Sequence, residues 1–163
     1  MSYFAAALAR SGGGWMAHEI ELDDVETIDD VVDLLREVEP DAGTTLLFVE
    51  EDDEYVAIVR LDSDEDDPRV FVSDGRAADS FAIAELLSDG IDRASTDVDG
   101  DEDESLGPDA EPMGDTDLLA DLGTSAGELL SLCAREGSLP SDVISAVCEK
   151  AGCLDELETL REV

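Results

Sequence analysis

Lysine is almost absent from this chain. Of its nine basic residues only Lys150 is a lysine, whereas aspartate and glutamate together number 45, which gives a formal net charge of -36. Nucleic-acid affinity comes largely from Lys and Arg side chains that neutralise phosphates. The composition therefore argues against direct binding of tRNA or DNA. It favours encounter with a cationic partner, by electrostatic steering that weakens with salt.

Side chains suited to acid-base or nucleophilic catalysis are also scarce. His18 is the only histidine, and its neighbour Glu19 lies in the same expected strand, where successive side chains face opposite ways. A catalytic cysteine-histidine pair would require one of the cysteines near the C-terminus to lie close to His18 in the fold. The spacing of these residues in the sequence does not show whether they are close. We therefore predict no catalytic residues and interpret His18 as a half-exposed strand histidine.

Cysteine is present in an odd number, as Cys133, Cys148 and Cys153 near the C-terminus. An odd count disfavours a disulfide framework, and reduced thiols in a cytosol fit it better. Without a second histidine nearby the three thiols make a poor zinc site. Cys133 and Cys148 fit the apolar faces of expected helices, so we predict neither a metal site nor a cofactor.

Long apolar runs are missing as well. No run approaches the ~20 residues of a membrane span. The first residues, MSYFAAALARSGGGW, lack the basic region that precedes the apolar stretch of a secretory signal, and Arg10 follows that stretch at once. These features predict a cytoplasmic protein without a membrane-spanning segment.

What is present is a clear alternation of strand and helix patterns in the first half. Residues 3–9 and 15–21 flank SGGG and predict a β-hairpin. TIDDVVDLLREVEP predicts a helix with Thr27 as its N-cap, Asp30 as the reciprocal acidic residue and Pro40 as its stop. The apolar residues of this helix recur at helical spacing, which predicts one buried face.

Three further strands and a second helix follow. The strands are TTLLFVE, EYVAIVRLD and RVFVSD, and the helix is predicted over 76–88, ending before Gly90. The middle strand alternates, with Tyr55, Ala57, Val59 and Leu61 on one face and Val56, Ile58 and Arg60 on the other. The order ββαβββα predicts an α+β fold with a mainly antiparallel five-stranded sheet and packed helices.

Composition divides the chain into three parts. Residues 1–88 form the predicted α+β domain, and residues 89–112 carry ten acidic residues against Arg93 with few apolar ones. Such a segment buries too little to offset its ordering entropy, which predicts a flexible acidic linker. Residues 113–163 show four short helical patterns and form a predicted small helical lobe, which packs either on the first domain or on a partner.

The most acidic stretch, DVDGDEDE at 97–104, has closely spaced carboxylates, as a calcium-binding loop does. An EF-hand loop needs a turning glycine at its sixth position and a bidentate glutamate at its twelfth. Counted from Asp97, these positions hold Glu102 and Pro108. The loop fails this test, and we interpret the stretch as a hydrated tether.

Two other acidic clusters, EEDDE at 50–54 and DSDEDDP at 62–68, bound the same predicted strand and so project from opposite ends of the sheet. Solvated turns and a surface adapted to high salt are two explanations for them. The third is an anionic surface that meets a basic partner, and the candidate residues for it are Asp64, Glu65, Asp66 and Asp67.

Several segments taken together resemble a known family. They are YFAAALAR with Trp15, ELDDVE at 21–26, TLLFVEEDDEYVAIVRLD at 45–62, DPRVFVSD at 67–74 and GDTDLLADLG at 114–123. In this order they resemble the actinobacterial tRNA adenosine deaminase-associated proteins. The resemblance implies association with a tRNA-editing deaminase and carries over no catalytic residues.

The sequence does not contain the deaminase chemistry itself. Zinc deaminases hold their metal with an H-x-E segment and a later P-C-x-x-C, and the second motif does not occur here. We therefore predict a non-catalytic accessory protein that binds a basic partner, with a tRNA adenosine deaminase as the candidate. The alternative is an acidic scaffold or nucleic-acid mimic that binds another basic protein.

Overall fold

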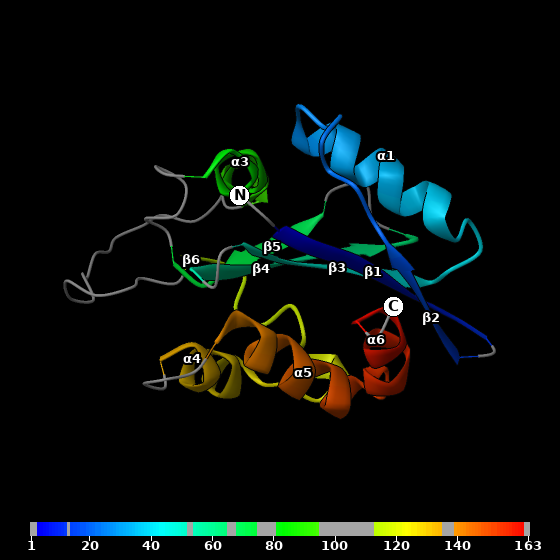
Figure 1. Ribbon diagram of the computed structural model, residues 1–163, viewed down its shortest axis with the longest axis vertical. Helices are drawn as coiled ribbons and strands as arrows, with labels where there is room; N and C mark the ends of the chain where they lie inside the picture. The colour runs from blue at the N-terminus through cyan, green and yellow to red at the C-terminus, as the bar shows by residue number, and fades with distance from the viewer. Residues whose placement is uncertain are drawn as a thin grey trace.

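The computed structural model describes residues 3–12, 14–51, 54–64, 68–74, 81–94, 113–134 and 139–161. Within these ranges an antiparallel sheet is covered by helices on both faces (Figure 1). The strands lie side by side in the order β2-β1-β3-β4-β5-β6. None of the helices in the described ranges has the length and apolar character needed to cross a membrane.

The sheet contains the five predicted strands and one short addition. They are β1 (Tyr3–Ser11), β2 (Gly14–Glu19), β3 (Thr44–Glu51), β4 (Tyr55–Asp62), β5 (Arg69–Val72) and β6 (Met113–Gly114). All neighbouring pairs are antiparallel, so the predicted α+β class is confirmed. The two-residue β6 begins the segment predicted as a helical lobe. It is a strand because it pairs with the end of β5, which no local pattern reveals.

The helices lie in two groups, one on each face of the sheet (Figure 1). They are α1 (Ile28–Val38), α3 (Ala82–Ala94), the 3-10 helix η1 (Ala120–Leu122), α4 (Ala126–Ala134), α5 (Pro140–Ala151) and α6 (Leu154–Arg161). The predicted capping box of α1 is present, since Thr27 and Asp30 each accept a backbone N–H from the other. Ser125 and Glu128 cap α4 in the same way.

Helix α3 extends beyond its predicted end. The pattern predicts an end before Gly90, yet the backbone is helical through Ala94. A glycine inside a helix costs about 1 kcal/mol relative to alanine, which is small enough for a packed helix to continue through it. The rest of the predicted linker, residues 95–112, lies outside the described residues.

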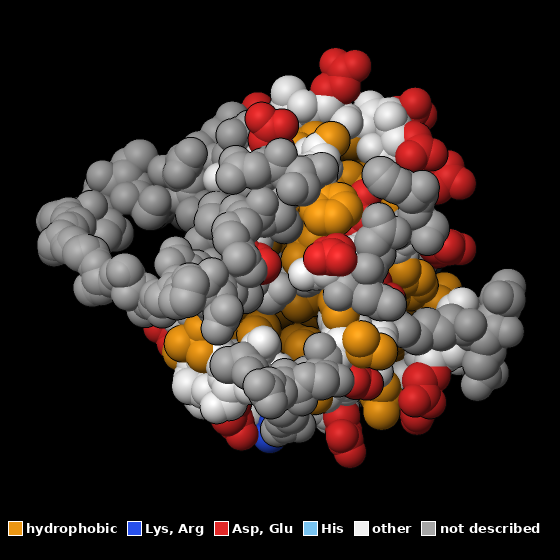
Figure 2. Space-filling view, turned by 60° about the vertical axis from the view of Figure 1, so that its left-hand side comes forward, with side chains coloured by type: hydrophobic (Ala, Val, Ile, Leu, Met, Phe, Trp, Pro, Cys, Tyr) orange, Lys and Arg blue, Asp and Glu red, His pale blue; other side chains and the backbone are white. Residues whose placement is uncertain are grey.

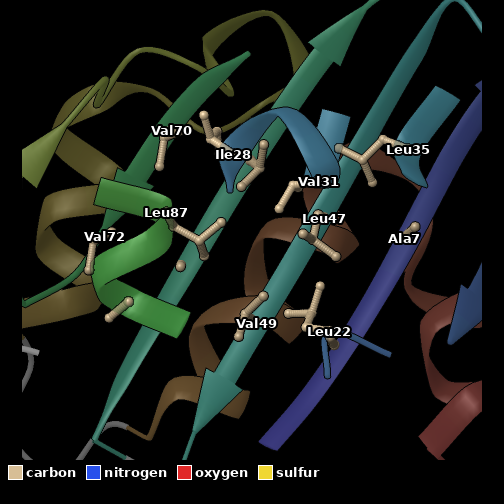
Figure 3. Packing of buried hydrophobic residues seen from close by; sticks show 14 of the residues in the cluster. Ala7, Leu22, Ile28, Val31, Leu35, Leu47, Val49, Val70, Val72 and Leu87 are labelled. Carbon is tan, nitrogen blue, oxygen red and sulfur yellow. The ribbon is translucent and has the colours of Figure 1, made fainter. Parts of the chain in front are cut away.

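Strand alternation sorts the buried side chains into two cores. On β4, Tyr55 and Val59 face α1 and α3, whereas Val56 and Ile58 face the opposite side, as the sequence predicts. Figure 3 shows the first core, in which Leu47 of β3 lies beside the side chains of α1. The apolar face predicted for α1 is therefore the face that covers the sheet.

The second core joins the opposite face of the sheet to α4, α5 and α6. Its sheet members come from β1, β3, β4 and β5, and its helical members include Leu129, Ile144 and Leu157. Trp15 adds a polar link, because its Nε1 donates to the carbonyl oxygen of Ala151 at 3.2 Å. The helical segment thus packs on the sheet, while the division of the chain into two domains remains a prediction.

Gly123 closes η1 against α5 and cannot carry a side chain without strain. Its φ is 109°, and a Cβ atom there would lie 2.9 Å from the carbonyl oxygen of Lys150. We expect Gly123→Ala to lower the free energy of unfolding by about 1–3 kcal/mol, because L residues are strained at this φ and α5 must shift. Urea unfolding measures the change.

Gly127, inside α4, provides the matched control for this substitution. A Cβ atom there would have nothing within 4 Å. Because alanine is favoured over glycine inside a helix, Gly127→Ala should leave stability unchanged or raise it slightly. Equal effects of the two substitutions would contradict the close approach of η1 to α5.

Candidate partner-binding surface

Of the four acidic residues predicted for partner binding, the structure describes only Asp64. Asp64 is exposed in the turn that follows β4. Glu65, Asp66 and Asp67 lie outside the described residues, so their role stays a prediction. At the other end of β4, Glu51 is buried and accepts a hydrogen bond of 2.8 Å from the Tyr55 hydroxyl. This carboxylate is therefore part of the interior and is not a solvated turn charge.

A more concentrated set of carboxylates lines a surface groove between α1 and the chain that connects β2 to α1. This acidic groove has a volume of about 670 Å³ and is lined by Glu19, Ile20, Glu21, Asp24, Val25, Asp30, Asp33, Leu34 and Glu37. Six of these nine residues are acidic, and the other three are aliphatic and half-buried. The groove therefore combines an apolar floor with a negatively charged rim.

Helix geometry explains why one wall of the groove is acidic. The residues of α1 that are buried against the sheet are Ile28, Val31, Val32 and Leu35. Asp33 and Glu37 are four positions apart, so they share the outer face of the helix. Asp30 is partly engaged, because its carboxylate accepts the N–H groups of Glu26 and Thr27. Asp33 and Glu37 are exposed and carry the free charge of this wall.

No basic side chain lines the acidic groove in the described part of the chain. Carboxylates that line one groove add their potentials, and salt screens the sum over a Debye length of about 8 Å at physiological ionic strength. The result is a local negative field that attracts cationic groups and repels phosphates. Chemically, the arrangement suits Lys or Arg side chains of a protein and does not suit a nucleic-acid backbone.

Most of the basic side chains that the structure describes are engaged within the protein. Arg60 binds Asp62 and Asp121, Arg69 binds Asp115, and Lys150 binds Glu128. Arg10 lies over the ring of Trp15, 5.8 Å from its centroid. Arg60 is buried, so its charge is not available at the surface. Arg60, Arg69, Lys150 and Arg10 therefore take part in contacts within the fold.

The sheet separates His18 from the three cysteines. Trp15 and Ala17 of β2 pack on the second core, and strand alternation turns His18 to the other face. There its Nε2 lies 3.6 Å from Oε2 of Glu39, at the end of α1. The described cysteines all belong to the second core or pack against it. A cysteine-histidine pair therefore does not form among the described residues.

The cysteine thiols are also poor nucleophiles where they lie. Burial raises the pKa of the Cys133 thiol to about 11, because the thiolate is poorly solvated there. Cys148 and Cys153 are fully buried. At neutral pH almost no thiolate is expected at Cys133. His18, with 39% of its side chain exposed, matches the predicted half-exposed strand histidine.

The described residues contain no group of three or more His, Cys, Asp or Glu side chains arranged to hold a metal ion. The carboxylates of the acidic groove are among the residues searched, and they form no such group.

Sequence reasoning missed the acidic groove. The helical spacing of Asp30, Asp33 and Glu37 is visible in the sequence and places them away from the buried face of α1. These residues could not be distinguished from other acidic residues, however, because Asp and Glu are abundant in almost every segment of the chain. That the connection at 19–25 lies opposite this helix face is known only from the fold.

The fold and the groove together define a small, highly acidic α+β protein that presents carboxylates on a helix-covered antiparallel sheet. A family model described as Rv3753c-like tRNA adenosine deaminase-associated protein matches residues 3–154, from β1 to the start of α6. The chain belongs to this family, as the resemblance predicts. No significant match was found among curated proteins or among solved structures.

Proposed function

We propose that this chain is a non-catalytic, acidic accessory protein of the cytoplasm that binds a tRNA adenosine deaminase and modulates or stabilises it. The family description supports the choice of partner, since it names association with such an enzyme. The net charge of -36 supports the chemistry of the contact. An enzyme that holds tRNA needs cationic side chains to neutralise phosphates, so it offers a basic surface to an acidic protein.

The observation that carries this proposal is the acidic groove. Its rim provides carboxylates without an intervening basic side chain among the described residues, and its floor provides Ile20, Val25 and Leu34 for apolar contact. Charge complementarity mainly raises the rate of encounter and the specificity of binding, whereas buried apolar contacts hold the complex together. A groove with both features suits a basic segment of a protein partner.

The missing deaminase motif supports the non-catalytic part of the proposal. His18 is followed by Glu19 and Ile20, and no P-C-x-x-C occurs in the sequence. The fold adds a second reason, because His18 and the cysteines lie on opposite faces of the sheet. The zinc-dependent chemistry is therefore assigned to the partner polypeptide.

Binding of the purified deaminase tests this function. We expect a complex whose dissociation constant rises about tenfold or more as NaCl is raised from about 0.05 M to about 0.5 M, because salt screens the attraction. Reversing two charges on α1 with Asp33→Lys and Glu37→Lys should weaken the complex by a similar factor. Both side chains are exposed, so the fold should tolerate the change. Isothermal titration calorimetry measures the constants.

The matched control reverses two charges elsewhere, with Asp155→Lys and Glu158→Lys on the exposed side of α6. It changes the net charge equally and should leave binding within about twofold of the wild type. Absence of a complex at low and moderate salt, together with unchanged editing of the tRNA anticodon, would refute the proposal. Capture of a different basic protein in place of the deaminase would favour the scaffold or mimic alternative.

A further inference from the structure

A second hollow lies between α1, α3 and the start of β1, and it is mostly apolar. Its volume is about 370 Å³. Five large apolar residues that line it are only half-buried, although they pack on the first core: Tyr3, Val25, Phe81, Ile83 and Leu86. A concave and mostly apolar pocket with a few polar groups at its border is the usual form of a binding site. We call this feature the apolar hollow.

The side of the molecule that carries α3 is seen in Figure 2. Hydrophobic side chains gather in the middle of this view, and the charged side chains drawn around them are nearly all Asp and Glu. Of the two acidic residues that line the apolar hollow, Glu51 is buried and bonded to Tyr55, whereas Asp23 is exposed and accepts a hydrogen bond of 3.3 Å from the Tyr3 hydroxyl. The solvent-exposed charge of the hollow therefore lies on the side of Asp23.

Val25 connects the two features, since it lines both the apolar hollow and the acidic groove. Next to it, Asp23 lines the hollow and Asp24 lines the groove. A ligand that fills the hollow and extends past Val25 thus meets exposed carboxylates at once. This adjacency excludes an acidic ligand, because the carboxylates would repel it. It also disfavours a neutral ligand, because only a cationic group is attracted by the carboxylates of the groove.

We propose that the apolar hollow takes a large apolar side chain from a protein segment whose Lys and Arg residues lie in the acidic groove beyond Val25. The volume is sufficient for a large aromatic or aliphatic anchor, and such anchors in desolvated pockets dominate the energetics of protein interfaces. The occupant is a partner segment that is both basic and apolar. Its assignment to the deaminase rests on the proposed function.

The decisive variant adds a bulky side chain to the lining of the hollow. Ala82 lines the hollow at the start of α3 and is exposed, so the ring added by Ala82→Phe is expected to compete with the proposed anchor for space. The matched control is Ala120→Phe, at an exposed position of η1 on the opposite side of the sheet. Thermal unfolding of both variants checks that each is folded.

The probe is a fluorescently labelled helical peptide of leucine and lysine, and anisotropy measures its affinity for the full chain at about 0.05 M NaCl. We expect Ala82→Phe to weaken binding by about tenfold or more and Ala120→Phe by less than about twofold, because only the first occupies the anchor pocket. A peptide of leucine and glutamate should not bind. Equal affinity of the two Phe variants, no binding of the lysine peptide to the wild type, or equal binding of the glutamate peptide would overturn the proposal.

The same variants, mixed with the purified deaminase, separate this proposal from the function on which it rests. A complex that Ala82→Phe leaves unchanged would overturn the role of the apolar hollow and support the proposed function. Peptide binding that Ala82→Phe abolishes, without any complex with the deaminase, would support the hollow and refute the deaminase as partner. If Ala82→Phe weakens both the binding of the peptide and the complex with the deaminase, the role of the apolar hollow and the proposed function are both supported.

Discussion

Arg60→Ala is expected to lower the free energy of unfolding by about 2–4 kcal/mol, the largest effect of any single charged residue in the described structure. Only 6% of Arg60 is exposed, and its guanidinium binds both carboxylate oxygens of Asp121, the carboxylate of Asp62 and the carbonyl oxygen of Leu118. Removing one partner of such a network leaves buried polar groups unsatisfied. Because Asp121 is itself largely exposed, the expected cost lies at or below the usual range for a fully buried pair.

Chemical denaturation of two further variants isolates the source of this loss. Arg60→Met keeps the aliphatic stem and should be less damaging than Arg60→Ala. Asp121→Asn should cost less than about 1 kcal/mol, because the carboxylate is 63% exposed. Loss of stability in Asp121→Asn as large as that in Arg60→Ala would contradict the buried role of Arg60.

The ion pair also predicts a pH dependence. The Arg60 guanidinium holds the pKa of Asp121 below its ordinary value of 3.8. Since the folded state has the lower pKa, the stabilisation is fully present well above that ordinary value and is lost as the pH falls from it toward the lower pKa of the folded state. The stability difference between wild type and Arg60→Met should therefore be larger at neutral pH than near pH 3.

A chain that ends at residue 112 is expected to lose cooperative folding altogether. Such a chain lacks α4, α5 and α6, so the sheet face that these helices cover becomes exposed. Six large apolar side chains on this face are at most 1% accessible in the full chain: Leu8, Leu46, Phe48, Val56, Ile58 and Phe71. Burial of each contributes about 1.5–3 kcal/mol, so their sum is comparable with the whole stability of a domain, about 5–15 kcal/mol. Calorimetry and binding of a hydrophobic dye report the loss.

A full-length chain with a protease site inserted at residues 97–104 is the control for this truncation. After cleavage the two pieces should stay associated, because the contact between the sheet and α4, α5 and α6 is non-covalent and apolar. Retention of a sharp thermal transition by the truncated chain, close to that of the full chain, would contradict a core shared by the two parts.

Local signals in the sequence predicted the elements that depend on few neighbouring residues. Helix α1 follows from Thr27, Asp30 and a 3.6-residue apolar period, all within a dozen positions. The two faces of β4 follow from simple alternation. By contrast, β6 exists through its pairing with β5, and α3 continues past Gly90 in its tertiary setting. Such features depend on partners that are distant in the sequence.

The sign of the surface charge was readable from composition, but its location was not. Asp33 and Glu37 look like dozens of other carboxylates in the chain. They differ because a second segment, at residues 19–25, lies opposite them and forms a groove. Asp64, in contrast, lines neither the acidic groove nor the apolar hollow. A site made of ordinary residues is recognised by its shape, which a sequence does not state.

By itself the sequence determined the net charge of this protein, the α+β order of elements in its first half, the cap of α1 and the lack of the deaminase motif, because each depends on composition or on residues close together in the chain. The tertiary structure alone decided that the C-terminal helices cover the second face of the sheet, that Arg60 is buried against Asp121, and that His18 lies across the sheet from the cysteines. It also decided that the apolar hollow meets the acidic groove at Val25. These arrangements arise from complementary packing of distant segments, and that packing is a property of the folded chain.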